Sequence, residues 1–175
     1  MKFEATPLPG VFVIEPEPIN DERGFFARLF SQHEFAQHSL NPGLSQCSLS
    51  YNARAGTLRG LHYQAQPYGE AKLVRCTRGA IYDVALDLRQ DSPAFKQWFA
   101  VELSSDNHRQ LYLPEGCAHG FQTLIDHAEV YYHIAAPYVA AAARGVRWDD
   151  PAFNIAWPRT VSCISERDRA YADFR

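Results

Sequence analysis

Short runs of apolar and aromatic residues recur along the chain, and polar turn sequences separate them. Their lengths predict strands at 11–14, 24–30, 45–51, 57–64, 71–76, 80–88, 97–103, 110–113, 119–125 and 129–135. The intervening sequences include INDERG, RQDSP, SSDN, PEG and DDP, which are typical of turns. Regularly spaced short strands favour a β-sandwich or barrel over alternating strand–helix units.

The segment 80–88 shows the alternation most clearly. One face of an extended chain carries Asp83, Ala85 and Asp87, and the other carries Tyr82, Val84, Leu86 and Leu88. This pattern predicts a half-buried strand.

Helical sequence is scarce. Ser31 followed by Glu34 has the pattern of a capping box and predicts a short helix that ends near His38. Ser165 followed by Asp168 predicts a second short helix near the C-terminus. We therefore expect an all-β jelly roll with a few short helices, a fold that commonly encloses a small-molecule cavity.

Composition narrows the function. The 175 residues include 17 Lys and Arg against 20 Asp and Glu, which gives a formal net charge of −3, and 46% of them are hydrophobic. Such a chain can bury a sizeable core, and it lacks the basic excess that nucleic-acid binding requires. Since no repeat or linker-like tract interrupts it, we expect a single domain over residues 1–175.

Targeting and cysteine signals favour a cytoplasmic protein without a membrane partner. The start, MKFEATPLPGVFVIEPEP, lacks the apolar stretch of a signal peptide, and the apolar run at 134–143 is too short to span a bilayer. The four cysteines, Cys47, Cys76, Cys117 and Cys163, form no CxxC pair. We expect them to be small buried hydrophobes rather than zinc ligands.

Two segments concentrate residues that can do chemistry. The segment 56–79 holds Arg59, His62, Glu70, Lys72 and Arg75, and the segment 113–124 holds Pro114, Gly116 and His119. Their spacing resembles the two sequence boxes of the cupin superfamily, which implies a cupin-type double-stranded β-helix. Metal-binding cupins carry two histidines two residues apart in the first box, but here the second position is Gln64. Because His62, Glu70 and His119 alone make a poor transition-metal site, we expect no metal and no other cofactor.

A cupin cavity without a metal still offers acid–base chemistry. A neutral histidine accepts a proton near physiological pH, and Lys or Arg side chains stabilise an oxyanion. An acid is available from Tyr131, Tyr132 or Tyr138, which lie in or just after one predicted strand. This equipment suits removal of a proton next to a carbonyl.

Some of these residues have simpler interpretations. Strict alternation places Arg59 and His62 on opposite faces of their strand, so a shared site requires a bulge, for which Gly60 is the natural position. By spacing alone, Asp168 is the acidic member of the Ser165 capping box.

Three further candidate site residues also have simpler structural interpretations. Lys72 could equally occupy a surface position on an edge strand. Tyr132 shares its parity with Val130 and Ile134, which suits a core tyrosine as well as an acid. His119 could equally serve as a hydrogen-bonding residue in a turn.

Six segments together are more specific than any single motif. They are NDERGFFARLF (20–30), GTLRGLHYQ (56–64), EAKLVRCTRGAIYDVALDLR (70–89), SPAFKQW (92–98), LYLPEGCAHGFQTL (111–124) and DDPAFNIAWP (149–158). From about residue 7 to its end, the chain resembles the dTDP-4-dehydrorhamnose 3,5-epimerase family. The resemblance implies a metal-free, homodimeric cupin isomerase of dTDP-rhamnose and polysaccharide biosynthesis, acting on a nucleotide diphosphate-linked 4-keto-6-deoxyhexose. It also implies that the N-terminal strands within 1–30 contribute to the dimer and to the partner's site.

The resemblance assigns four catalytic roles. His62 would be the base that takes the C3 or C5 proton, and Asp168 would orient and charge-support its imidazole. Lys72 would lie against the 4-keto oxygen as the enolate forms. Tyr132 would return a proton from the opposite face and so invert the centre.

Six residues form the expected substrate-binding set: Arg23, Phe25, Gln46, Arg59, His119 and Tyr138. In the family pattern Tyr138 would stack on the nucleotide base, while Arg59, His119 and Arg23 would hold the sugar or diphosphate. Arg23 would reach the site of the partner subunit.

The departures from the family pattern cluster at the nucleotide end. Arg28 replaces a usual Glu, and an ungapped count places Cys47 and Leu49 where Gln and Asn are typical. Ala140 and Ala143 stand where Pro and Glu usually follow the stacking tyrosine. Without those groups a base loses hydrogen-bond readout, so a GDP-, CDP- or UDP-linked sugar competes with dTDP as the substrate. Epimerisation at only one carbon, a 3,4-ketoisomerase reaction, and a non-catalytic sugar-nucleotide-binding or metal cupin are also compatible with the sequence.

Overall fold

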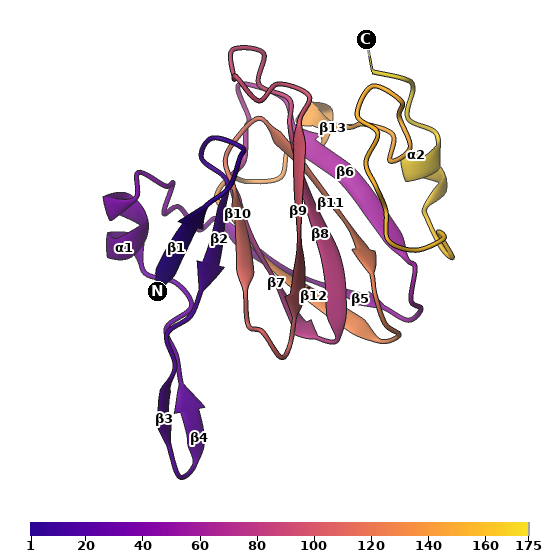
Figure 1. The fold of residues 1–175 in the computed structure, drawn as a ribbon. Helices are drawn as coiled ribbons and strands as arrows, with labels where there is room; N and C mark the ends of the chain where they lie inside the picture. The colour runs from indigo at the N-terminus through magenta and orange to yellow at the C-terminus, as the bar shows by residue number, and fades with distance from the viewer. Residues whose placement is uncertain (175) are drawn as a thin grey trace.

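Two antiparallel sheets packed face to face form the body of the protein in the computed structural model, which describes residues 1–174 (Figure 1). The six-stranded sheet has the order β1 (Lys2–Ala5), β2 (Phe12–Glu15), β10 (Gln110–Leu113), β7 (Lys72–Arg78), β12 (Ala128–Ile134) and β5 (Gln46–Asn52). The five-stranded sheet has the order β13 (Ala143–Gly145), β6 (Leu58–Gln64), β11 (Cys117–Thr123), β8 (Ala80–Asp87) and β9 (Trp98–Ser104). The prediction of a mostly-β, cupin-like jelly roll is confirmed.

A separate hairpin of β3 (Ile19–Asp21) and β4 (Gly24–Phe26) extends away from the sheets (Figure 1). The helical elements are α1 (Gln32–Gln37), the 3₁₀ turn η1 (Ala140–Ala142) and α2 (Glu166–Arg169). Both predicted capping serines are confirmed, since the Oγ of Ser31 accepts from the Glu34 N–H and that of Ser165 from the Asp168 N–H.

Each of the ten predicted strands corresponds to an observed strand, but the run 24–30 is extended only as far as Phe26. Its last residue, Phe30, packs instead against Phe35 of α1. Sequence missed β1, β3 and β13. Two of these, β1 and β13, are short edge strands that pair on one side only, so they need no strong apolar alternation.

Strand β8 is covered on both faces, so the prediction of a half-buried strand is wrong. Ile81 and Ala85 pack into the core between the sheets, whereas Val84 and Leu86 pack into a second apolar cluster with Val146. The segment after β13 therefore covers the outer face of the five-stranded sheet.

The cysteines are free, but only two of them are buried. Cys76 and Cys117 lie in the core, where burial raises the thiol pKa to about 11 and about 12. Cys47 and Cys163 are exposed, so the expectation of four buried cysteines is wrong for this pair. Within residues 1–174 no helix has the length and apolar character to cross a membrane.

Candidate active site

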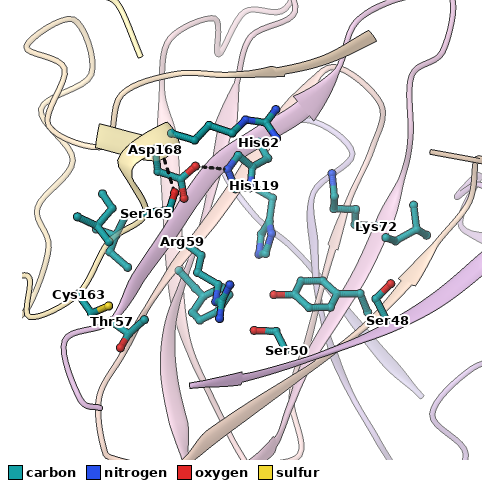
Figure 2. A pocket seen from close by; sticks show the side chains of 16 residues that line it. Ser48, Ser50, Thr57, Arg59, His62, Lys72, His119, Cys163, Ser165 and Asp168 are labelled. Carbon is teal, nitrogen blue, oxygen red and sulfur yellow. Dashed lines mark hydrogen bonds and ion pairs between the residues drawn. The ribbon is translucent and has the colours of Figure 1, made fainter. Parts of the chain in front are cut away.

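One cleft between the two sheets brings most of the predicted site residues together. Its inner half has a volume of about 560 Å³ and its outer half about 430 Å³. The two halves share five lining residues, Ser48, His62, Lys72, Ile134 and Arg167, so they are continuous. Figure 2 shows His62, Arg59, His119 and Lys72 around the inner half, with Asp168 and Ser165 beside His62.

An irregularity in β6 lets Arg59 and His62 share the cleft. His119 pairs with His62, whereas Phe121, two residues along β11, pairs with Arg59, three residues back along β6. The extra residue reverses the alternation, so both side chains face inward. The prediction of a bulge at Gly60 is confirmed: Gly60 has a φ of +123°, and a Cβ there would lie 2.5 Å from the Gly120 Cα.

Replacing Gly60 with alanine is therefore expected to destabilise the protein by roughly 3 kcal/mol or more, because the methyl group meets backbone rather than a movable side chain. Chemical denaturation with a two-state fit measures this. Gly24→Ala is the matched control, because Gly24 has the same φ of +123° but no neighbour within 4 Å of the added Cβ. Equal losses in the two variants would show that close packing at Gly60 is not the cause.

His62 and Asp168 form a hydrogen-bonded pair although 106 residues separate them in sequence. The His62 Nε2 and the Asp168 Oδ1 lie 2.6 Å apart, and the Gly60 N–H donates to the other carboxylate oxygen at 3.2 Å. Burial raises the pKa of Asp168, but the hydrogen bond and charge of His62, the Gly60 N–H and the Ser165 hydroxyl outweigh it and lower the pKa below its usual value. An ionised Asp168 accepts the Nε2–H, which leaves Nδ1 as the basic nitrogen of His62.

The capping interpretation of Asp168 is therefore half right. Its backbone N–H donates to the Ser165 hydroxyl at 3.0 Å, as a helix cap requires. Its carboxylate also contacts His62 and the Gly60 N–H. Helix α2 thus serves to deliver the carboxylate to the cleft.

A second histidine–carboxylate pair lies deeper. The His119 Nε2 and the Asp83 Oδ1 are 2.7 Å apart, and both side chains are buried. Burial raises the pKa of Asp83, although the charge and hydrogen bond of His119 act against it. His119 belongs to β11 rather than to a turn.

Lys72 is a buried residue of the central strand β7, not a surface residue of an edge strand. Its ammonium group forms an ion pair with Glu70, whose side chain is equally shielded. The pair lies where the two halves of the cleft meet, since Glu70 lines the outer half and Lys72 lines both.

Tyr132 approaches the inner half from β12, on the sheet opposite His62. Its ring packs edge-on against His119, with centroids 5.9 Å apart. Burial and then the charge of Asp83 raise the pKa of Tyr132, while Ser50 and Arg59 act to lower it. The phenol is therefore strongly held in its protonated form at neutral pH.

The outer half contains Gln46, Tyr138, Ala143 and Arg167. The amide of Gln46 donates to the Ala136 carbonyl at 3.1 Å. The neighbouring hydroxyls of Tyr171 and Tyr138 raise the pKa of Arg167, so a fixed cation lies along both halves of the cleft.

The ungapped sequence count placed Cys47 and Leu49 at the nucleotide-binding edge of the cleft, and this placement is wrong. Along β5 the side chains of Gln46, Ser48 and Ser50 line the cleft, whereas Cys47 and the exposed Leu49 have the opposite parity. Ala143 does line the outer half, and Arg28 pairs with Glu34 outside the cleft.

Two predicted site residues, Arg23 and Phe25, lie on the β3–β4 hairpin and do not line the cleft of their own chain. Arg23 is exposed and pairs with Asp21. Phe25 is exposed, and its ring lies 5.0 Å from that of His108.

Sequence reasoning missed Asp83, Arg167, Ser48, Ser50 and Cys163 as residues of the site. A signal existed for Asp83, because a carboxylate on the core side of a strand needs a buried partner. Arg167 directly precedes Asp168 in the capping box, but nothing in the sequence indicates that helix α2 lies beside the cavity.

The three side chains with the character of metal ligands all have other partners. His62 contacts Asp168, His119 contacts Asp83, and Glu70 contacts Lys72. Among the described residues no three His, Cys, Asp or Glu side chains are grouped closely enough to bind a metal ion. The donor set at this cleft therefore suits acid–base work better than coordination.

Known proteins that are similar to this chain in sequence and fold are named as epimerases. The family model for dTDP-4-dehydrorhamnose 3,5-epimerase matches residues 5–175. The enzyme of that name from Sinorhizobium fredii is 44% identical over 96% of this chain and 87% of its own length.

Solved structures agree with the sequence comparison. The dTDP-4-dehydrorhamnose 3,5-epimerase of Bacillus anthracis, with TDP and PPi bound, aligns with a TM-score of 0.94 and 42% identity over 99% of each chain. The Legionella pneumophila epimerase in complex with dTDP-4-keto-L-rhamnose aligns with a TM-score of 0.90 and 35% identity over 97% of this chain and 90% of its own. This chain belongs to the dTDP-4-dehydrorhamnose 3,5-epimerase family.

Proposed function

We propose that the protein epimerises dTDP-4-dehydro-6-deoxy-D-glucose at C3 and C5 to give dTDP-4-dehydro-L-rhamnose. The observation that carries the proposal is the placement of a carboxylate-backed histidine, His62, and a protonated phenol, Tyr132, on opposite sheets of one cleft. The Legionella relative, which has the same fold, was solved in complex with dTDP-4-keto-L-rhamnose. An inversion needs a base on one face of a carbon and an acid on the other, and this cleft offers both.

The chemistry begins at a C–H bond beside the 4-keto group. The bond breaks as His62 Nδ1 takes the proton, and the electron pair moves onto the 4-keto oxygen to form an enolate. Asp168 stabilises the resulting imidazolium through Nε2–H, as buried carboxylates do for catalytic histidines. The ammonium of Lys72 stabilises the enolate oxygen.

Inversion follows when Tyr132 donates its proton to the other face of the same carbon. The product carbonyl re-forms, and proton exchange with solvent restores the tyrosine and the neutral histidine. The substrate and the product have the same oxidation state, so the reaction needs no redox partner. Repetition at the second carbon that flanks the ketone uses the same pair of groups.

The rest of the cleft binds the substrate. Arg59 and His119 contact the sugar and its phosphate, while Gln46 and Tyr138 hold the nucleoside in the outer half. Arg167 adds a cation between the two halves, where a diphosphate that links sugar to nucleoside would lie.

The nucleotide is tested by comparing carriers. With dTDP-, UDP-, CDP- and GDP-linked 4-keto-6-deoxyglucose, we expect the dTDP sugar to have the highest kcat/KM, measured by NMR of the sugar product. Ala143 and Ser48 present short side chains to the base, so we expect discrimination against UDP to be modest, within about tenfold. A higher kcat/KM for a purine carrier would contradict the thymidine assignment.

We further propose a homodimer in which the N-terminal strands cross to the partner. The β3–β4 hairpin exposes 71% of Ile19 and 73% of Phe26. Large apolar side chains exposed together on a hairpin that projects from the body mark a surface that binds another protein. It also carries Arg23 and Phe25, which are predicted site residues outside their own cleft. A second copy that receives the hairpin would cover the apolar side chains and complete the site.

The variant Ile19→Asp/Phe26→Asp is therefore expected to be monomeric and to lose at least about tenfold in kcat/KM, because each cleft loses its partner's hairpin. Light scattering after gel filtration measures the mass. Glu22→Ala, in the same hairpin turn, is the control. An unchanged mass for the double variant would contradict this role of the hairpin.

A further inference from the structure

Gln64 occupies the position where a metal-binding cupin has its second histidine, and it is almost entirely buried. It ends β6, two residues after His62, and only 3% of it is exposed. It nevertheless lines the outer half of the cleft. A buried amide at a binding cleft must either bind ligand or have its hydrogen bonds satisfied within the protein.

The hydrogen bonds of Gln64 go to the loop that carries Tyr138. Its Nε2 donates to the Pro137 carbonyl at 3.1 Å and to the Tyr68 carbonyl at 3.1 Å. Its Oε1 accepts from the Val139 N–H at 2.6 Å. Both amide hydrogens are therefore used, and two of the three contacts immediately flank Tyr138.

Tyr138 lines the outer half of the cleft, and 60% of the residue is exposed. Within the 3₁₀ turn the Val139 carbonyl accepts from the Ala142 and Ala143 N–H groups at 2.9 and 3.1 Å, and the Ala65 N–H donates to the Ala142 carbonyl at 2.9 Å. The side-chain hydrogen bonds to the main chain of 137–139 come from the amide of Gln64.

We propose that Gln64 is a positioning residue for the nucleotide: it clamps the main chain on both sides of Tyr138 and so fixes the ring as a stacking platform. This inference rests on the proposed role of Tyr138 in holding the base. The position at which related folds bind a metal is used here to build a nucleoside site.

The chemistry of the clamp requires an amide. Two carbonyls and one N–H must be matched by two donors and one acceptor on a single short side chain. A glutamate offers no donor, a neutral histidine offers one donor and one acceptor, and a methionine offers neither at comparable strength. Each substitution therefore leaves at least one loop carbonyl unpaired.

The test measures the dissociation constant of dTDP by calorimetry for Gln64→Met and for the isosteric Gln64→Glu. We expect both to weaken dTDP roughly tenfold, since base–aromatic stacking of ordinary strength is lost when the platform moves. Deuterium exchange of the sugar at saturating substrate should stay within about twofold of wild type, because the acid–base groups are untouched. A tenfold loss in kcat with unchanged dTDP affinity would overturn the proposal.

Gln122→Met is the matched control. Gln122 is also a buried glutamine that clamps a loop, since its Nε2 donates to the Arg159 carbonyl at 2.9 Å and its Oε1 accepts from the Arg159 N–H at 3.0 Å. That loop is remote from Tyr138 in sequence and does not line the outer half. We expect Gln122→Met to lower the melting temperature but to leave dTDP affinity unchanged; a tenfold loss here as well would assign the effect to general destabilisation and overturn the proposal.

A double-mutant cycle with Tyr138→Ala completes the test. We expect Tyr138→Ala to weaken dTDP roughly tenfold, and Gln64→Met to add little in that background. Additive losses of dTDP affinity would show that Gln64 does not act through Tyr138. They would overturn the proposal for Gln64 but leave the stacking role of Tyr138 intact. If Tyr138→Ala leaves dTDP affinity unchanged, the stacking role itself fails, and the inference fails with it.

Discussion

Replacing His62 with asparagine is expected to lower kcat for epimerisation by roughly 10²–10⁴-fold, the usual contribution of a positioned general base. The amide keeps a hydrogen-bonding group beside Asp168 but has no basic nitrogen for the C–H proton. The KM should change far less, because binding of the nucleotide depends on the outer half of the cleft. NMR of the sugar over time gives both constants.

His33→Asn is the control for this substitution. His33 lies on α1 at the surface, and its ring forms a side-chain hydrogen bond with Gln37 of the same helix. We expect wild-type turnover for it. A His62→Asn enzyme with more than about a tenth of wild-type kcat would contradict the assignment of the base.

Replacing Tyr132 with phenylalanine should separate proton removal from inversion. His62 still takes and returns protons on its own face, so solvent deuterium enters the substrate with retention of configuration. Net epimerisation, which needs the acid on the opposite sheet, is expected to fall about 100-fold or more. The measurement compares label uptake with product formation in the same reaction.

The neighbouring substitution Tyr131→Phe is the matched control, because Tyr131 is adjacent on β12 and has the opposite parity. It should leave inversion intact. The result also decides between two chemistries: a 3,4-ketoisomerase that needs only the base would keep its turnover in Tyr132→Phe. Full activity of that variant would therefore exclude Tyr132 as the acid.

The fold was largely predictable because its signal is local. Alternating runs located the strands of both sheets, and two serines located the helices. The edge strands β1 and β13 lacked such a signal, since a strand that pairs on one side tolerates polar or small residues. The covering of β8 on its outer face was also hidden, because it depends on a segment about 60 residues later in the chain.

The site was harder to predict from the sequence than the fold, because its contacts join residues that are far apart along the chain. The bulge at Gly60 followed from the need to place Arg59 and His62 together, and the structure has it. By contrast, spacing alone interpreted Asp168 as a helix cap, and only family resemblance joined it to His62. The pairing of His119 with Asp83 required the register of β11 on β8, which no local pattern specifies.

Solvent deuterium incorporation into dTDP-4-keto-6-deoxyglucose, with His62→Asn run beside wild type, tests the central claim most directly. We expect label at both C3 and C5 with the wild-type enzyme, and label that enters both carbons roughly 10²–10⁴-fold more slowly with the variant. Label that enters both carbons of the substrate at a near wild-type rate in His62→Asn, or its absence in wild type on this substrate, would contradict base-catalysed epimerisation by this cleft.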